Sequence, residues 1–504
     1  MLPISDCSPF TRFLQLIPDP KLAMTSTNLS SDLSPKHNLN PLDIPEIRSM
    51  VGQYLGRSDL VRCLRVCKSW HALFVPLVWS TITVGPEIYS WDDQPPLDAF
   101  IRHSHHLKVL SLDIDAHHEY RSTSCPNLLR LRVNAIRKIE SEGIDIIPVQ
   151  IAPYEKLRYL NIYGVVMRTS QRIIWEPVHY QSLSELELRS LEIEPTGTAT
   201  FWDLCTQLVS LKFDRVTVTE MPARSITFDR LQRLQLELSS QIPIEHQLEW
   251  ITQCPNLTSL FWNYNVVDPT SRFMRHFVPG TWPQLSELVL AGIEFTDAQL
   301  ARVIGAMQNL KSLSVQACEV GSRFLEALRH HSQTLTLLGT FDCEVSTPSL
   351  VPKILASFPH LESLSVERVM SLDIIDSPPW VCEDSLKVLR IGISFPLNQD
   401  TDYQRQVFQR ISRLTNLKKL TLDCGRGIDK SLHLSLDNGL DQLATLKQLE
   451  KLSLLFRPEP LSVRDAEWMI NNWKNLKKVE GYFSYDMELL ESMFSAAGVK
   501  FGVF

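Results

Sequence analysis

The sequence predicts an α/β protein in which a small helical head is followed by a curved solenoid of strand, turn and helix units. Two observations predict this fold class. Residues 45–79 carry apolar side chains at helical spacing in three short segments. The pattern Leu-x-x-Leu-x-Leu then recurs from Leu107 to Leu476. Such a fixed recurrence is typical of a solenoid, because a single unit cannot bury its apolar side alone.

Length and composition fit this prediction and exclude several functions. The 504 residues suffice for a long array behind a small head, and 44% apolar with 21% charged residues is typical of a folded protein. The net charge of -7 gives no general attraction to nucleic acid, and no apolar run is long enough for a membrane span. Asp6, Asp19 and several prolines interrupt any signal-peptide core. We therefore expect an intracellular protein, cytoplasmic or nuclear, with no nucleic-acid or membrane partner.

Composition shifts divide the chain into four regions. Residues 1–40 are rich in Ser, Pro, Asn and Asp without periodicity, so we predict a disordered tail. Residues 41–84 form the head and 85–106 a linker or N-terminal cap. Residues 107–504 form the solenoid with a C-terminal cap.

Three short helices are predicted in the head. The first starts at Pro45, a residue suited to the first turn, and ends at Gly56. Its apolar face holds five residues at helical spacing: Ile47, Met50, Val51, Tyr54 and Leu55. Ser58 is predicted to cap the second helix, and Pro76 to end the third.

The repeats are defined by their first leucines. These stand at positions 107, 128, 157, 183, 208, 231, 257, 285, 310, 335, 361, 386, 417, 449 and 476. Fourteen intervals over 369 residues give about 26 residues per unit. In the best-preserved unit, Leu288 and Leu290 are predicted to point inward and Thr296 to cap a helix. The units at 335 and 476 are degenerate, and we assign the last to the C-terminal cap.

The motifs of the head resemble those of an F-box, the helical module that docks proteins onto the Skp-type adaptor of cullin-RING ubiquitin ligases. They are Glu46-Ile47, Asp59-Leu60, Val66-Cys67-Lys68-Ser69-Trp70 and Trp79. The units behind resemble the cysteine-containing leucine-rich repeats that often accompany an F-box. Together the two resemblances cover nearly all of the chain after residue 40. One departure is that Pro45 directly precedes Glu46, where the family has one residue between them.

The resemblance implies a function and a set of contact residues. It implies a substrate-recognition subunit of a Skp-cullin-F-box E3 ligase, whose repeats bind an unidentified protein target for ubiquitination. The adaptor-facing positions that it implies are Pro45, Ile47, Val51, Leu55, Leu60, Val66 and Cys67. Trp70 and Trp79 are assigned to the core of the head. The alternative is a non-catalytic scaffold or regulatory protein outside the ubiquitin system, in which residues 42–80 do not bind the adaptor.

No catalytic or metal-binding chemistry is predicted. The chain has no G-x-S-x-G, G-x-x-x-x-G-K-[ST] or H-E-x-x-H motif, so we expect neither an enzyme nor a bound cofactor. Cys63 and Cys67 have no second pair and are interpreted as core thiols. One histidine group lies near the first repeat: His103, His105, His106, His117 and His118. No carboxylate or cysteine is spaced to complete a metal site there.

The target is predicted to bind the concave face, where outward strand positions of successive units line up. Aromatic residues and arginines anchor interfaces most often. The candidate residues are Arg130, Arg132, Tyr159, Tyr163, Glu187, Arg189, Arg233 and Phe261. Phe261 is the strongest single candidate, and the alternative is that a loop or the next helix covers it. The mixed charges of the first repeat units equally fit a surface that only keeps the protein soluble. Later units are poorer in such residues, so the N-terminal half is the predicted target site.

Overall fold

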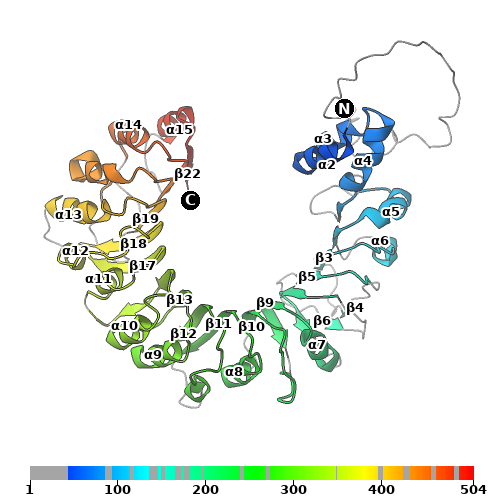
Figure 1. Ribbon diagram of the computed structural model, residues 1–504, viewed down its shortest axis with the longest axis horizontal. Helices are drawn as coiled ribbons and strands as arrows, with labels where there is room; N and C mark the ends of the chain where they lie inside the picture. The colour runs from blue at the N-terminus through cyan, green and yellow to red at the C-terminus, as the bar shows by residue number, and fades with distance from the viewer. Residues whose placement is uncertain are drawn as a thin grey trace, which may run out of the picture. The chain divides into compact units, whose positions relative to one another are not determined.

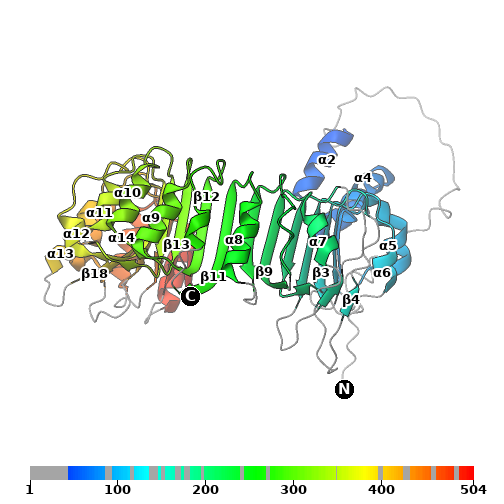
Figure 2. The ribbon, with the colours of Figure 1, turned by 90° about the horizontal axis from the view of Figure 1, so that it is seen from below.

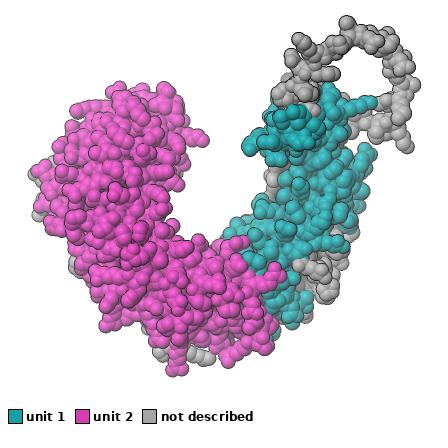
Figure 3. All heavy atoms as spheres, viewed as in Figure 1, with its two compact units in different colours: residues 1–223 teal, residues 224–504 magenta. Residues whose placement is uncertain are grey.

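A computed structural model describes residues 44–85, 94–113, 118–135, 146–148, 154–164, 172–174, 182–193, 198–218, 220–238, 243–267, 273–347, 349–395, 401–423, 432–455, 461–481 and 487–503. The predicted tail, residues 1–40, lies outside these ranges. The chain divides into two compact units, residues 1–223 and 224–504 (Figure 3). Each unit is described by itself below.

The head consists of three helices that pack around a small core. They are α2 (Pro45–Tyr54), α3 (Arg57–Cys63) and α4 (Lys68–Val78). Phe74 and Trp79 are almost completely buried. Gly52 lets α2 approach α4 closely, because a Cβ atom there would lie 2.6 Å from the Phe74 ring.

Two boundaries inside the head differ from the sequence prediction. Helix α3 begins at Arg57 with Gly56 at its N-cap, so Ser58 lies inside the helix and is not its cap. Helix α4 continues through Pro76 to Val78, so Pro76 does not end it. A proline lacks only its own N–H, and later residues still donate, as Trp79 N–H does to the Val75 carbonyl at 3.0 Å.

Unit 1 continues from the head into a parallel sheet. The strands pair in chain order and are β1 (Thr81–Val84), β2 (Val109–Asp113), β3 (Arg130–Ala135), β5 (Tyr159–Gly164), β7 (Glu185–Arg189) and β9 (Ser210–Val218). A second parallel ladder joins β4 (Ile146–Pro148), β6 (Arg172–Ile174) and β8 (Glu192–Ile193) to the end of β9. The helical segments are α5 (Leu97–His103), η4 (Ser104–His106), α6 (His118–Ser122) and α7 (Thr198–Cys205).

Unit 2 is a longer array of the same kind. Its main strands are all parallel and are β10 (Arg233–Leu238), β11 (Ser259–Val267), β12 (Glu287–Glu294), β13 (Ser312–Gln316), β15 (Leu337–Phe341), β17 (Ser363–Met370), β18 (Val388–Ser394), β19 (Lys419–Asp423), β20 (Lys451–Leu454), β21 (Lys478–Gly481) and β22 (Lys500–Val503). A short pair, β14 (Glu319–Val320) with β16 (Glu344–Val345), lies outside this sheet.

Helices cover one side of the unit 2 sheet and leave the other side open (Figures 1 and 2). They are α8 (Ile244–Thr252), α9 (Asp297–Gly305), α10 (Ser322–Arg329), α11 (Leu350–Leu355), α12 (Ser371–Ile375), α13 (Thr401–Ile411), α14 (Val463–Asn472) and α15 (Met487–Ala496). The 3-10 segments are η6 (Phe273–His276), η7 (Leu436–Asn438) and η8 (Leu440–Thr445). The open side is the concave face of the unit, and the outward strand residues lie on it.

The predicted strands of the leucine-rich repeat units are confirmed throughout. A strand begins two residues after each of the fifteen predicted first leucines, including those at 335 and 476. All fifteen leucines are buried, with exposures between 0% and 5%. Thr296 caps α9 as predicted, in a capping box with Gln299. Among the main strands the pattern missed two: β1 precedes the predicted start of the solenoid at residue 107, and β22 follows the predicted last unit. The short strands β4, β6, β8, β14 and β16 were not predicted either.

A Cys-Pro-Asn-Leu motif occurs at residues 125–128 and again at 254–257, with the same structural role. Cys125 and Cys254 are buried. Asn127 donates its side-chain N–H to the His105 carbonyl and Asn256 donates to the Asp229 carbonyl, both at 2.8 Å. Each asparagine thus ties its unit to the preceding one, so the motif marks a position in the repeat.

Candidate protein-binding surfaces

Exposed apolar side chains concentrate on the head. Five of the fifteen large apolar residues that are exposed in the described part of the chain fall between residues 44 and 66: Ile44, Met50, Val51, Tyr54 and Val66. We call these five the head surface. Tyr54 is 88% exposed and Met50 62%. Grouped exposed apolar side chains mark an interaction site, because leaving them in water costs free energy that a partner recovers.

The predicted adaptor-facing residues fall into three classes of exposure. Pro45, Val51, Val66 and Cys67 are exposed, and Ile47 and Leu55 are half-buried. Leu60 is only 7% exposed. A side chain that is already buried offers little surface to a partner, so we assign Leu60 to the core of the head. Trp79 is buried and Trp70 half-buried, with its ring edge-on to Phe74 at 5.4 Å.

The sequence prediction omitted the two most exposed members of the head surface. Met50 and Tyr54 lie four residues apart on α2 and therefore share a face of the helix. The signal was already in the sequence, because helical spacing of three or four residues also groups Met50 with Ile47. Cys67 is exposed, so its interpretation as a core thiol was wrong, and Cys63 is half-buried. A hydrogen bond with the Ser69 hydroxyl, with Sγ and Oγ 3.1 Å apart, lowers the pKa of the Cys67 thiol.

The strand register of unit 1 aligns the predicted concave residues in columns. Arg130, Tyr159 and Glu185 are neighbours in one column. The next columns are Arg132, Asn161, Glu187 and Lys212, then Asn134, Tyr163, Arg189 and Asp214. Arg130 and Arg132 are exposed, and Tyr159, Tyr163, Glu187 and Arg189 are half-buried.

Glu187 is the centre of a hydrogen-bonded network on this face. Its carboxylate accepts from the Tyr159 hydroxyl at 2.6 Å and from Arg189 Nη2 at 2.6 Å. Asn161 donates at 2.9 Å, and Lys212 Nζ lies 3.1 Å away. Burial opposes ionisation, but hydrogen bonds from Tyr159, Arg189 and Lys212 outweigh it and hold the pKa of Glu187 at about 2. The network fixes the side chains of this face in one arrangement.

Cations outnumber anions around this network. The columns of β3 to β9, with Arg215 beside them, contain five arginines or lysines and three carboxylates: Arg130, Arg132, Arg189, Lys212 and Arg215 against Glu185, Glu187 and Asp214. The Arg130 guanidinium lies 5.5 Å from the centre of the Tyr159 ring. The concave face of unit 1 is thus polar and ordered, with exposed arginines at its start.

The remaining two predicted target residues belong to unit 2. Arg233 is exposed at the start of β10, and Phe261 is half-buried in β11. Phe261 is paired in register with Gln235 on one side and Val289 on the other. The adjacent Trp262 points inward and is completely buried. Phe261 therefore lies on the concave face as predicted, with part of its ring available to a partner.

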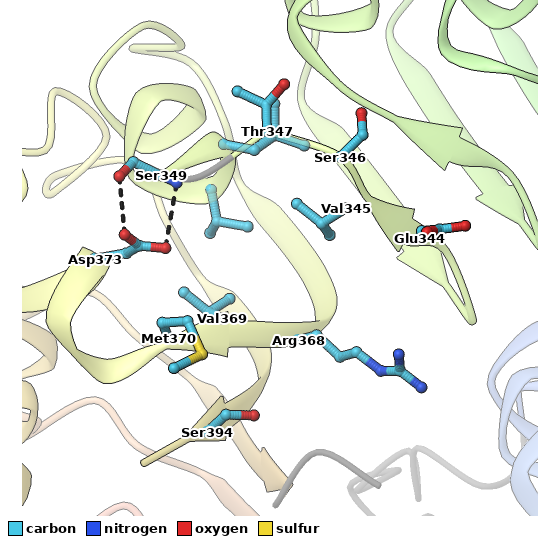
Figure 4. A pocket seen from close by; sticks show the side chains of 12 residues that line it. Glu344, Val345, Ser346, Thr347, Ser349, Arg368, Val369, Met370, Asp373 and Ser394 are labelled. Carbon is cyan, nitrogen blue, oxygen red and sulfur yellow. Dashed lines mark hydrogen bonds between the residues drawn. The ribbon is translucent and has the colours of Figure 1, made fainter. Parts of the chain in front are cut away.

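A cavity of about 500 Å³ opens in unit 2 beside β16 and the end of β17 (Figure 4). Val345, Val369 and Met370 are among its apolar lining residues. The Asp373 carboxylate accepts from the backbone N–H and hydroxyl of Ser349 at 3.2 and 2.9 Å (Figure 4). Asp373 thereby holds Ser349 in a left-handed conformation (φ 59°) at the start of α11.

The histidine group lies where the head meets the first repeats. The His103 ring stacks on Trp79 at 4.7 Å, and His105 and His106 are 3.9 Å apart. His117 and the side chain of His118 lie outside the described residues. Within the described ranges, no group of three or more His, Cys, Asp or Glu residues is placed to hold a metal ion. Among the helices in those ranges, none is both long and apolar enough to span a bilayer.

His103 predicts a loss of stability in mild acid. Burial, reinforced by the charges of His106 and Arg102, lowers the pKa of His103 to about 4. The unfolded chain binds this proton near pH 6.5 and the folded chain only near pH 4, so the free energy of unfolding falls as the pH drops through that window. We expect His103→Phe, which retains a ring against Trp79, to reduce the difference in urea midpoint between pH 7 and pH 5. The exposed His246→Phe is the control, and equal pH dependence in both variants would contradict the prediction.

Known proteins match the head and a longer part of the chain. The family model for F-box-like domains matches residues 45–84, which contain α2, α3, α4 and β1. The mouse (Mus musculus) F-box/LRR-repeat protein 21 is 24% identical over 393 residues, covering 65% of this chain and 90% of that protein. A crystal structure of an internalin from Listeria monocytogenes is 18% identical and covers 64% of this chain and 81% of its own, with a TM-score of 0.38.

The two parts of the molecule point to one family. The F-box-like match falls on the helices that bear the head surface, and the similarity to the mouse protein extends well beyond the head. The repeat geometry described above supplies the leucine-rich solenoid. The head is F-box-like, and the chain as a whole is similar to F-box proteins with leucine-rich repeats.

Proposed function

We propose that this chain is the substrate-recognition subunit of a Skp-cullin-F-box ubiquitin ligase inside the cell. The head docks the Skp-type adaptor, and the concave strand face binds a protein target. The observation that carries the proposal is the head surface, whose five exposed apolar side chains lie within or directly beside the segment that matches F-box-like domains.

The contribution of the chain to ubiquitin transfer is positional. A target held on a stacked array near the ubiquitin-loaded E2 has a high effective concentration there, and this effect needs no reactive group in the chain. The described surfaces fit such a role, because they offer apolar contact area on the head and ordered arginine and tyrosine side chains on the solenoid.

We propose that the adaptor docks on the exposed and half-buried residues of the predicted adaptor-facing set, together with the head surface. Pro45, Ile47, Val51, Leu55, Val66 and Cys67 remain in the set, Met50 and Tyr54 are added, and Leu60 supports the fold of the head. On the solenoid, the proposed target residues are Arg130, Arg132, Tyr159, Tyr163, Glu187 and Arg189 in unit 1, and Arg233 and Phe261 in unit 2.

The proposal is tested by capture of purified Skp-type adaptor and cullin on the immobilised full chain. We expect the adaptor to bind directly and the cullin to bind only when the adaptor is present. A folded chain that captures neither would contradict the proposal and favour a leucine-rich repeat scaffold outside the ubiquitin system.

A further inference from the structure

The last four strands of unit 2 each begin with a lysine. These residues are Lys419 in β19, Lys451 in β20, Lys478 in β21 and Lys500 in β22. The strand register pairs each lysine directly with the next one. We call these four residues the lysine row. Neighbouring strands lie about 4.8 Å apart, so the row extends over about 14 Å of the concave face.

The lysine row is confined to the C-terminal end of unit 2. The same register position in the four preceding strands is occupied by uncharged residues, which are Ser312, Leu337, Ser363 and Val388. A surface that only needed charge for solubility would not require this segregation. The positive charge is therefore a local property of β19 to β22.

One carboxylate partly neutralises the row. Glu480, in β21, forms ion pairs with both Lys451 and Lys478, and the Ser453 hydroxyl donates to it at 3.0 Å. Burial opposes ionisation, but the hydrogen bonds from the two lysines hold the pKa of Glu480 at about 2. Lys419 and Lys500 form no ion pair with any described residue. Within the row itself, four cations and one carboxylate give an excess of three positive charges, and Glu450, which immediately precedes β20, adds a weaker attraction to Lys419.

The residues that immediately precede these strands form a second row, in which most charges are paired. Successive backbone hydrogen bonds connect Glu362, Lys387, Lys418, Glu450 and Lys477. Lys387 pairs with Glu362 and Lys477 with Glu450, both at 2.7 Å. This second row also contains lysines, each directly before the first residue of a strand, but their charges are largely paired. It supplies matched controls for the lysine row.

We propose that the lysine row binds a short acidic helix of a protein partner. Residues three or four apart on a helix are about 5–6 Å from each other, close to the spacing of the lysines. Alternate residues of an extended strand are about 6.6 Å apart and would lose register along the row. Nucleic-acid binding draws its affinity from many phosphate contacts, about 6 to 10 in a strongly salt-dependent complex, and three excess charges provide fewer. The inference rests on the proposed function only in taking this partner to be the ligase target.

The test uses a fluorescein-labelled alanine-based helical peptide with glutamate at every fourth position, and a second peptide with glutamine in those positions. Binding to the full chain is measured by fluorescence anisotropy at low and at physiological salt. We expect Lys419→Glu/Lys500→Glu to weaken binding of the glutamate peptide by about tenfold or more, because charge reversal replaces attraction by repulsion. The control Lys387→Glu/Lys477→Glu changes the net charge equally and should weaken binding by less than about twofold.

Three results would overturn the proposal. The wild-type chain could bind both peptides equally, or the control variant could lose as much affinity as the lysine-row variant. A single-stranded oligonucleotide of the same charge could also bind more tightly than the peptide through the same lysines, which would assign the row to nucleic acid. Adaptor capture is measured on the same variants and should be unchanged, since it depends on the head. Failure of the lysine row and failure of the ligase proposal are therefore distinguished.

Discussion

Replacing Val51 and Val66 by aspartate is expected to abolish capture of the Skp-type adaptor by the full chain. Both side chains are exposed, at 41% and 60%, so the charges cost little in the free protein. In a docked complex each carboxylate would be desolvated in an apolar contact, which costs about 2 kcal/mol or more per central residue. Two such residues predict a loss of affinity above about 100-fold. Surface-immobilised adaptor and a concentration series of each variant would measure the loss.

The control for this double variant is Ile101→Asp. Ile101 is 51% exposed on α5 in the same unit, so it undergoes the same apolar-to-acidic change outside the head. We expect its affinity for the adaptor to equal that of the wild-type chain and the thermal midpoints of all three proteins to agree. Undiminished capture by the double variant would show that the head surface is not the docking face. The proposed function itself is tested by capture of the adaptor on the wild-type chain.

The repeats could be predicted because each strand has the same physical requirement. The first leucine of every unit must be buried between stacked neighbours, and the alternation of the strand places the next two apolar residues on the same side. The two missed main strands have a different residue at the first position. Trp79 precedes β1 and is buried like the leucines, while Gly498 precedes β22 and has no side chain to bury. A leucine pattern cannot detect either of them.

The surfaces could be predicted only in part, because exposure depends on packing and on register. Helical spacing alone did not show that Leu60 is buried while Met50 is exposed. The lysine row is hidden in the sequence, since its members are 32, 27 and 22 residues apart. Loops of different length separate strands that are nevertheless exact neighbours in the sheet. The available signal was a lysine directly before each of the last four apolar strand segments.

Phe261 and Trp262 predict very different losses of stability for two adjacent substitutions. Trp262 is completely buried, its Nε1–H donates to Gln247 Oε1 at 3.1 Å, and its ring lies 5.7 Å from that of Phe273. Trp262→Ala is expected to lower the free energy of unfolding of this part of the solenoid by about 3–5 kcal/mol. Phe261 is half-buried on the concave face, so Phe261→Ala should cost about 1 kcal/mol.

Hydrogen exchange followed by mass spectrometry measures both effects locally, which suits a repeat array whose stability is distributed over neighbouring units. Trp262→Ala should speed exchange in β10, β11 and β12 by about 100-fold or more, since each 1.4 kcal/mol corresponds to a factor of ten. Phe261→Ala should change it by less than about tenfold. Equal acceleration in both variants would show that Phe261 is a covered core residue. A difference in the expected direction leaves Phe261→Ala as a folded variant in which loss of target binding reports the contact itself.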